Sequence, residues 1–174
     1  VANLTIVTPS RWLADEVKQS FLKDYPVQVI PNGVDQTIFR PTENDLRKKL
    51  GLEHSFVILG VANVWERRKG LSYFCGLAKK LPEDCKIILI GLNEKQIREL
   101  PEEIIGITRT ENAEELAGYY SMADVFVNAT LEDNFPTTNL EALSCGTPVI
   151  TFETGGSPES LDKTCGRVVR KEDA

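Results

Sequence analysis

The sequence predicts a doubly wound α/β fold with a mostly parallel sheet, because apolar runs alternate with amphipathic stretches along all 174 residues. Several of the apolar runs contain no polar alternation, which indicates strands buried on both faces by helices. A length of 174 residues, with 41% hydrophobic and 26% charged residues, is enough for one well-packed domain and short for two.

The expected strands are short runs rich in valine, isoleucine, leucine and phenylalanine. In chain order they cover residues 4–8, 27–31, 56–62, 86–91, 104–108, 125–128, 148–152 and 167–169. The amphipathic stretches between them predict helices over residues 10–22, 43–50, 70–81, 94–99, 113–122, 137–144 and 158–161.

Start and stop signals support these helices. Ser10 and Asn112 can accept hydrogen bonds from the first turns of the helices that follow them, and Gly146 with Pro148 ends another. The Asn-Gly pair in residues 31–35 predicts a turn, because this pair tolerates positive φ, and residues 39–43 read as a connector. A domain boundary is expected there.

Charge and cysteine content restrict the function classes. The 20 basic and 26 acidic side chains give a net charge of −6, which argues against nucleic acid as the main partner. Residues 1–5 carry no charged leader, and no apolar run approaches the length of a transmembrane segment. Cys75, Cys85, Cys145 and Cys165 form no C-x-x-C pair, so reduced core thiols and a cytoplasmic location are expected, with two disulfides as the alternative.

The segment 131–150 carries the strongest chemical signal. Pro136 suits a first helical turn, and the free amides of Thr137 and Thr138 would then face an anion. Glu141 follows within the next turn. Carboxylates beside a phosphate suit a ligand that also carries hydroxyl groups, which donate to carboxylates, so a ribose or hexose is expected.

A second signal is the loop 60–70, where Arg67, Arg68 and Lys69 follow an apolar strand. Ligands of open α/β sheets bind at the carboxyl ends of strands, so these cations can hold a diphosphate, although a solvated basic loop explains them too. Trp65 either shields a ligand or closes the loop. His54, the only histidine, is expected in a surface turn, which disfavours a Ser-His-Asp triad and a histidine metal site.

Four motifs in order resemble glycosyltransferase family 4 over residues 5–169. They are residues 29–35 with Phe39 and Pro41, then Lys69-Gly70, then two acids eight residues apart that end at Glu141, then Gly155-Gly-Ser-Pro-Glu159. On its own the last motif is explained equally well by an ordinary left-handed turn. The resemblance implies one half of a GT-B architecture, in which two Rossmann-type domains face each other across a cleft. Residues 1–35 would then be the end of an amino-terminal acceptor-side domain, and residues 36–174 a nucleotide-sugar-binding domain that continues further.

The resemblance also implies roles for single residues. Glu141 would hold the ribose hydroxyls, Lys69 the donor diphosphate, and Asp133, with Glu132 adjoining it, the catalytic position beside the donor sugar. The usual Gly-Arg pair is absent near Asn63, so Arg67 or Arg68 would supply the phosphate-binding arginine. The remaining donor contacts would come from the phosphate-covering loop and helix start and from the base-binding turn, at Asn134, Phe135, Thr137, Thr138, Thr108 and Arg109.

The resemblance implies a retaining hexosyltransferase that uses a nucleoside diphosphate sugar as donor and needs neither cofactor nor metal, and the sequence has no Asp-x-Asp string. A sugar or lipid-linked acceptor would bind through the amino-terminal domain, with peripheral membrane contact open, and the isolated chain would be inactive. The alternatives are a non-catalytic nucleotide-sugar-binding module, a GT-B sugar-nucleotide epimerase and a flavodoxin-like signalling domain, although no phosphoacceptor aspartates cluster at the first strand ends.

Overall fold

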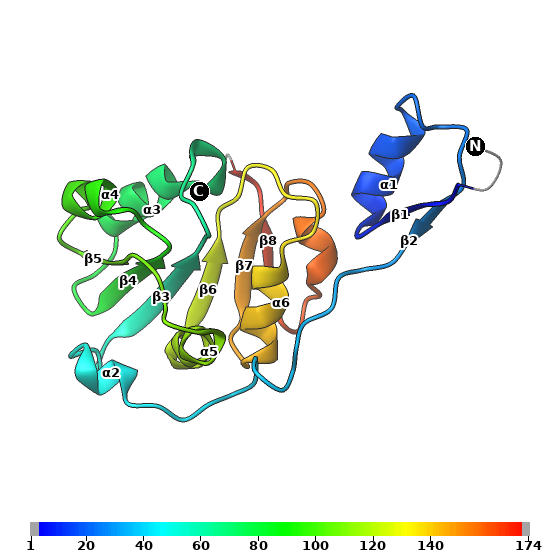
Figure 1. Cartoon of the computed structure of the whole chain (residues 1–174). Helices are drawn as coiled ribbons and strands as arrows, with labels where there is room; N and C mark the ends of the chain where they lie inside the picture. The colour runs from blue at the N-terminus through cyan, green and yellow to red at the C-terminus, as the bar shows by residue number, and fades with distance from the viewer. Residues whose placement is uncertain (1–3, 172–174) are drawn as a thin grey trace.

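The computed structural model describes residues 4–171 and contains a six-stranded parallel sheet (Figure 1). Its strand order is β5-β4-β3-β6-β7-β8. These strands are β3 (Phe56–Val61), β4 (Cys85–Ile90), β5 (Ile104–Ile107), β6 (Val125–Asn128), β7 (Val149–Phe152) and β8 (Gly166–Val169). A separate two-stranded parallel sheet pairs β1 (Ile6–Thr8) with β2 (Val27–Val29). The predicted α/β class and all eight predicted strands are confirmed.

The helices also lie where the sequence predicts them. They are α1 (Arg11–Lys18), α2 (Leu46–Lys49), α3 (Leu71–Ala78), α4 (Glu94–Glu99), α5 (Ala113–Met122) and α6 (Thr137–Ser144), with short 3-10 helices η1 (Arg67–Lys69) and η2 (Ser157–Ser160). Ser10 and Asn112 cap α1 and α5 as predicted. Helix α1 ends before residue 22 because the Ser20 hydroxyl donates to the Val17 carbonyl and accepts the Leu22 amide, which competes with helical pairing.

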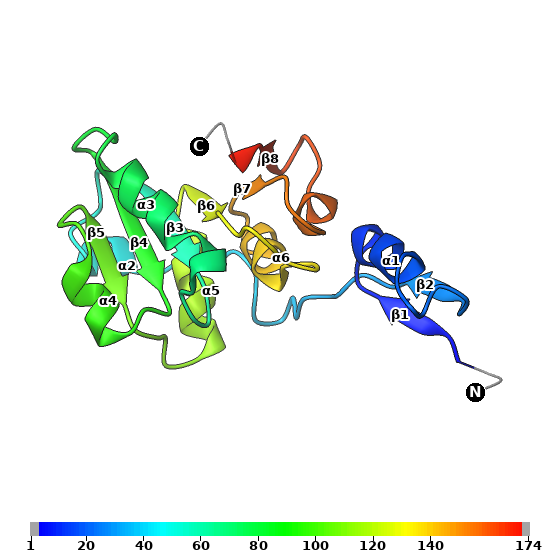
Figure 2. The ribbon, with the colours of Figure 1, turned by 90° about the horizontal axis from the view of Figure 1, so that it is seen from above.

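Two hydrophobic clusters cover the two faces of the sheet. Val57 and Leu59 of β3 pack with α5 and α6 on one face, whereas Ile58 packs with Phe74 of α3 and Ile87 of β4 on the other. Figure 2 shows α3 and α6 on opposite sides of the strands. Because both faces of β3 and β4 are buried, β3 has no polar side chain and the last four residues of β4, 87–90, are apolar and buried.

The strand order reverses between β3 and β6. From β3 the chain proceeds outward through β4 to β5, then crosses to β6 and proceeds the other way through β7 to β8. β3 and β6 pair in parallel through Ile58 with Val125 and Leu59 with Phe126. In open α/β sheets a crevice forms outside the carboxyl ends of the two strands at such a switch point.

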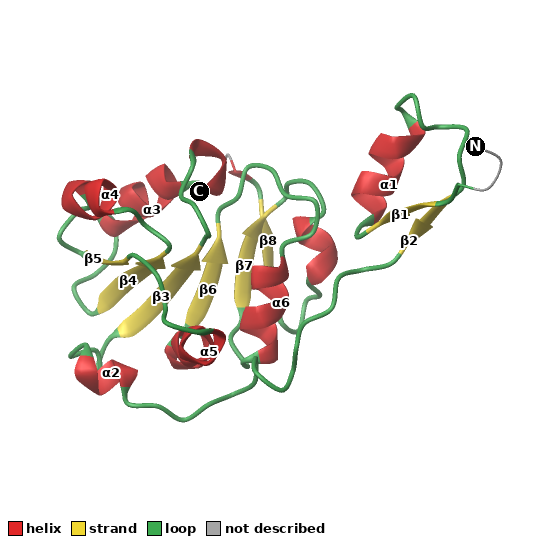
Figure 3. Cartoon of the chain, in the orientation of Figure 1, coloured by secondary structure: helices red, strands yellow, loops and turns green. Residues whose placement is uncertain are grey.

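The β1-α1-β2 unit lies beside the six-stranded body, and an irregular segment joins the two (Figure 3). The predicted turn at residues 31–35 is wrong. Residues 31–35 form no turn, Gly33 is not among the glycines with positive φ, and within residues 4–171 no residue other than glycine has positive φ. The turn lies further on, where the Asp35 carboxylate accepts the Thr37 amide at 2.9 Å and the Asp35 carbonyl accepts the Phe39 amide. β2 pairs in parallel with β1, the Ile30 amide continues this pairing to the Thr8 carbonyl at 2.9 Å, and residues 31–35 then form no turn.

Glu159 links the two parts of the structure. Its carboxylate accepts the Arg11 and Trp12 amides, each at 2.8 Å, and so caps the first turn of α1 from η2. Free first-turn amides and the helix dipole both favour a carboxylate at this position. The sequence pattern identifies Ser10 as a cap but gives no sign of this second one.

Replacing Glu159 with alanine is expected to loosen the α1 end of the β1-α1-β2 unit. A lost cap typically costs about 0.5–2 kcal/mol, so the Arg11 and Trp12 amides should exchange hydrogen about 2- to 30-fold faster, as measured by mass spectrometry. Glu153→Ala is the control, because Glu153 is an exposed partner of Arg170 at 3.6 Å. Equal exchange in the two variants would show that Glu159 does not hold the unit.

Within residues 4–171 no helix is both long enough and apolar enough to cross a membrane. All four cysteines are free, so the two-disulfide alternative is wrong. Cys145 lies in the core as expected, and the other three are only partly buried.

Candidate functional site

A cavity of about 450 Å³ opens at the switch point between β3 and β6. Its walls come from the 61–69 segment after β3, from Asn128 at the end of β6, from the 133–141 segment that enters α6, and from Leu116 of α5. The segments that carried the two chemical signals of the sequence therefore meet in one place, as the carboxyl-end rule for parallel sheets predicts.

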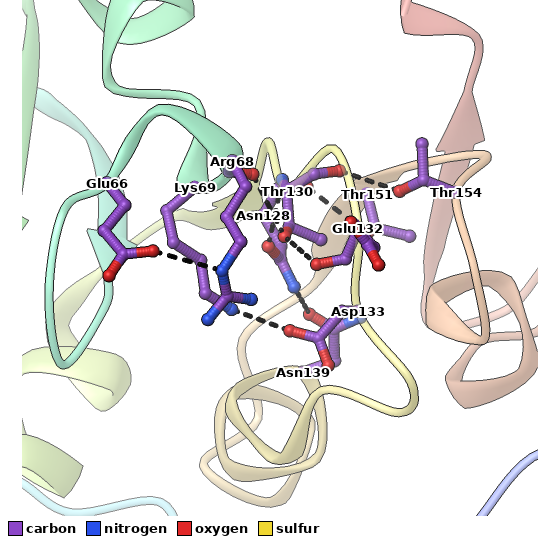
Figure 4. Close-up of polar contacts among 10 residues, drawn as sticks. All are labelled: Glu66, Arg68, Lys69, Asn128, Thr130, Glu132, Asp133, Asn139, Thr151 and Thr154. Atoms are coloured by element: carbon purple, nitrogen blue, oxygen red, sulfur yellow. Dashed lines mark hydrogen bonds and ion pairs between the residues drawn. The ribbon is translucent and has the colours of Figure 1, made fainter.

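Lys69 is the best-defined cation of this cavity. Its Nζ lies 2.7 Å from Asp133 Oδ2, and the two side chains are only 23% and 19% exposed (Figure 4). Arg68 is different, because its Nε lies 3.3 Å from Glu66 Oε2 and both side chains are more than half exposed. Arg67 is exposed and lies outside the cavity lining. The solvated-loop interpretation therefore holds for Arg67 and fails for Lys69.

Residues 67–70, called here the cationic turn, are fixed by hydrogen bonds to the loop that follows β6. The Arg68 carbonyl accepts the Leu131 amide at 2.7 Å and the Thr130 hydroxyl at 3.3 Å. The Thr154 hydroxyl donates to the Thr130 carbonyl at 2.7 Å, which joins the turn at Gly155 and Gly156 to the same loop (Figure 4). These bonds fix the relative positions of the cations and the acidic loop without any ligand.

Gly70 allows this close approach. Its φ is +78°, and a Cβ at this position would lie 2.2 Å from the Ala129 carbonyl oxygen. Any other residue would meet both a strained left-handed backbone and a clash with the end of β6. The cationic turn can therefore lie against β6 only because residue 70 is glycine.

The N-terminus of α6 forms the opposite wall. Pro136 occupies the N-cap with φ −70° and ψ 115°, one position before the first turn in which the sequence placed it, and no side chain caps this end. The amides of Thr137 and Thr138 open the helix, and both residues line the cavity. First-turn amides have no intrahelical partners and carry the positive end of the helix dipole, so this wall suits an anion.

Glu141 lies one turn further along α6 and also lines the cavity. The Tyr120 hydroxyl donates to Glu141 Oε2 at 3.0 Å. Burial raises the pKa of the Glu141 carboxyl, although hydrogen bonds from Tyr120 and Thr137 act to lower it. One wall of the cavity therefore offers cations and amides, and another offers a partly desolvated carboxyl that can accept hydrogen bonds.

A polar network holds α6 in place behind the cavity. Asn128 Nδ2 donates to Asn139 Oδ1 at 2.8 Å, and Asn139 Nδ2 donates to Ser160 Oγ at 2.9 Å. Asn139 is fully buried, so its amide is satisfied on both sides. The network connects β6, α6 and η2, and Asn128 is its member that faces the cavity.

Most of the residues that the sequence singled out line the cavity. They are Asn63, Arg68, Lys69, Asp133, Phe135, Thr137, Thr138 and Glu141. Others lie outside the lining and are exposed, namely Arg67, Thr108, Arg109, Glu132 and Asn134. Trp65 closes the loop, because it is buried, its Nε1 donates to the Ile90 carbonyl at 2.8 Å, and its ring packs edge-on against Phe74.

Sequence reasoning missed Val64, Leu116 and Asn128 as parts of the cavity wall. Asn128 ends a predicted strand, so the carboxyl-end rule was sufficient to find it. No sequence signal identifies Leu116, because it reaches the cavity wall only through the packing of α5 beside β3.

Comparison with known proteins places this cavity in a family context. The family described as "Glycosyl transferases group 1" matches residues 55–174. A D-inositol 3-phosphate glycosyltransferase of Corynebacterium jeikeium is 29% identical over 92% of this chain and 43% of the relative. An alpha-galactosylglucosyldiacylglycerol synthase of Streptococcus pneumoniae is 31% identical over 85% of this chain and 43% of the relative. The chain thus spans less than half the length of these relatives.

Solved structures share the fold. Sucrose-phosphate synthase of Thermosynechococcus elongatus matches with a TM-score of 0.83 and 24% identity, over 97% of this chain and 46% of that one. Anabaena HepE in complex with UDP-glucose matches with a TM-score of 0.80 and 20% identity, over 98% of this chain and 52% of that one. Because the family match covers more than half of the chain, the chain belongs to the glycosyl transferases group 1 family, as its resemblance to glycosyltransferase family 4 predicted.

Proposed function

We propose that this chain is the donor-binding part of a retaining glycosyltransferase that moves a hexosyl group from a nucleoside diphosphate sugar to an acceptor hydroxyl. The observation that carries the proposal is the switch-point cavity, which is lined by Lys69, by the first turn of α6 and by the hydroxyl acceptor Glu141. The names of the relatives support transfer of a sugar, and the Anabaena structure holds UDP-glucose.

Leaving-group stabilisation is the main chemical contribution of the chain in this proposal. When the bond between sugar and diphosphate breaks, the diphosphate gains negative charge. In the proposal, the diphosphate binds beside Lys69 and the amides of Thr137 and Thr138, which would stabilise that charge. Loss of one such donor typically costs about 3–4 kcal/mol of transition-state stabilisation.

The structure also favours particular residues where the sequence left two open. Asp133 lines the cavity and Glu132 is exposed outside it, so we assign Asp133 as the acid beside the donor sugar. By the same reasoning Arg68, rather than Arg67, is the candidate phosphate-binding arginine. Thr108 and Arg109 stay candidate base contacts, which a base could reach only by extending beyond the cavity lining.

The whole protein is part of the proposal. Residues 1–35 are assigned to the acceptor-side domain and residues 36–174 to the donor-binding domain, with the acceptor held outside this chain. The proposal includes no cofactor and assigns stabilisation of the leaving group to the cations and amides of the cavity. A cytoplasmic location and a peripheral membrane contact of the whole enzyme belong to the same proposal, and the free thiols are in keeping with the former.

Calorimetric titration of the chain with uridine, guanosine and adenosine diphosphates and their hexose derivatives tests this function. We expect the diphosphates of one of these nucleosides to bind. Glu141→Ala should weaken that binding at least about tenfold, because a hydrogen bond to a charged group is worth about 1.5–3 kcal/mol. Glu114→Ala is the control, because Glu114 is exposed on α5 and lies outside the cavity. Failure of every nucleotide to bind would refute the proposal.

The same material tests the chemistry. The chain alone should bind donor without transferring sugar, whereas the longer protein should transfer it with retained anomeric configuration. Conversion of the donor to an epimeric nucleotide sugar without an acceptor would instead identify an epimerase.

A further inference from the structure

Tyr120 of α5 is held rigidly in the core. It is fully buried, and its ring packs edge-on against Phe126, with centroids 5.4 Å apart, and against Phe39, with centroids 6.1 Å apart. Its backbone carbonyl accepts the Thr147 hydroxyl at 2.6 Å. Both the ring and the backbone are therefore fixed by packing and hydrogen bonding.

The one polar atom of this side chain is directed at the candidate site. Tyr120 Oη donates to Glu141 Oε2 at 3.0 Å, although Tyr120 itself does not line the cavity. Burial raises the pKa of Tyr120 well above its ordinary value, and the nearby Glu141 acts in the same direction. The hydroxyl therefore stays protonated and donates to Glu141 throughout the neutral range.

We propose that Tyr120 is a positioning residue that holds the Glu141 carboxylate ready for two adjacent hydroxyl groups of a ligand, an inference that rests on the proposed function. A glutamate side chain has several rotatable bonds, and ordering them at the moment of binding reduces affinity. The bond from Tyr120 fixes Oε2 before a ligand arrives. Thr137 gives the carboxylate a second hydrogen bond, and the two remaining lone-pair positions of its oxygens can accept two hydroxyl donors.

A cycle of two proteins and two ligands tests this role. The ligands are uridine diphosphate and its 2′,3′-dideoxy analogue, or the guanosine or adenosine pair if that nucleoside binds more tightly. The wild-type chain should prefer the ribose form. Tyr120→Phe keeps the ring and removes only the hydroxyl, so it should reduce this preference about tenfold and leave the affinity for the dideoxy form unchanged. A purely structural role would weaken both ligands equally.

Tyr119→Phe is the matched control, because Tyr119 is the adjacent buried tyrosine of α5 and does not hydrogen-bond Glu141. It should bind both ligands like the wild type. In a Glu141→Ala background, Tyr120→Phe should have no further effect on affinity. Thermal melting of each variant confirms that it is folded at the titration temperature.

The outcomes separate this inference from the proposed function. If the wild type binds no nucleoside diphosphate, both are refuted. If it binds ribose and dideoxy forms equally, Glu141 does not contact the hydroxyls and the role of Tyr120 is refuted with it. If it prefers the ribose form and Tyr120→Phe keeps that preference in full, the positioning role alone is wrong.

Discussion

Replacing Lys69 with methionine is expected to weaken nucleoside diphosphate binding by about 10- to 150-fold. Methionine is also unbranched and keeps the apolar stem, so the change removes mainly the ammonium group. A hydrogen bond to a charged partner is worth about 1.5–3 kcal/mol, which corresponds to this range of dissociation constants. The structure places Nζ in the cavity at a largely buried position, where the charge is screened less than on the surface.

Isothermal titration calorimetry with the nucleoside diphosphate and with the nucleoside alone checks the prediction. The variant should lose affinity for the diphosphate and keep its affinity for the nucleoside, since Lys69 acts on phosphate. Lys95→Met is the control, because Lys95 is an exposed lysine whose partner Glu99 lies 3.9 Å away. Equal diphosphate affinity in Lys69→Met and wild type would remove Lys69 from the site.

Replacing Gly70 with alanine is expected to destabilise the fold by roughly 2–4 kcal/mol. The left-handed backbone alone costs an alanine about 1–2 kcal/mol. The added Cβ would meet the Ala129 carbonyl oxygen at 2.2 Å, and this contact is with backbone that cannot rotate away. For a chain of this length the loss lowers the melting temperature by roughly 5–15 °C.

Gly76→Ala is the matched control for this substitution. Gly76 lies in the middle of α3, and a Cβ there would meet nothing within 4 Å. An alanine in a helix interior is more favourable than glycine by up to about 1 kcal/mol, so this variant should melt at the same temperature or higher. A Gly70→Ala chain that melts with the wild type would show that the turn can move away from β6.

The sheet could be predicted from the sequence because burial on two faces leaves a local signature. Residues 56–62 and 86–91 contain almost no polar residue, and β3 and β4 occupy nearly these positions. Helix starts could be predicted from local signals too, since Ser10 and Asn112 cap the helices that directly follow them. Much of the cavity followed from one rule, which places ligands at the carboxyl ends of parallel strands.

The remaining features depend on contacts between distant residues. Tyr120 and Glu141 are 21 positions apart on different helices, and Glu159 caps Arg11 from 148 positions away. No pattern within one helix predicts such pairs. Asn32-Gly33 shows the opposite failure, because the pair favours a turn locally, yet residues 31–35 contain none and the hydrogen-bonded turn after β2 begins at Asp35.

The reversal of strand order divides the main sheet into a piece that ends after β5 and a piece that begins with α5. Lys69 belongs to the first piece, Asp133 and Glu141 to the second, and the exposed stretch 108–112 is the covalent connection between them. A nucleotide that touches all three residues would act as a bridge across this division. If the chain were cut within 108–112 the ligand would favour reassembly of the two pieces, so the same cavity could serve as the switch of a split-protein reporter.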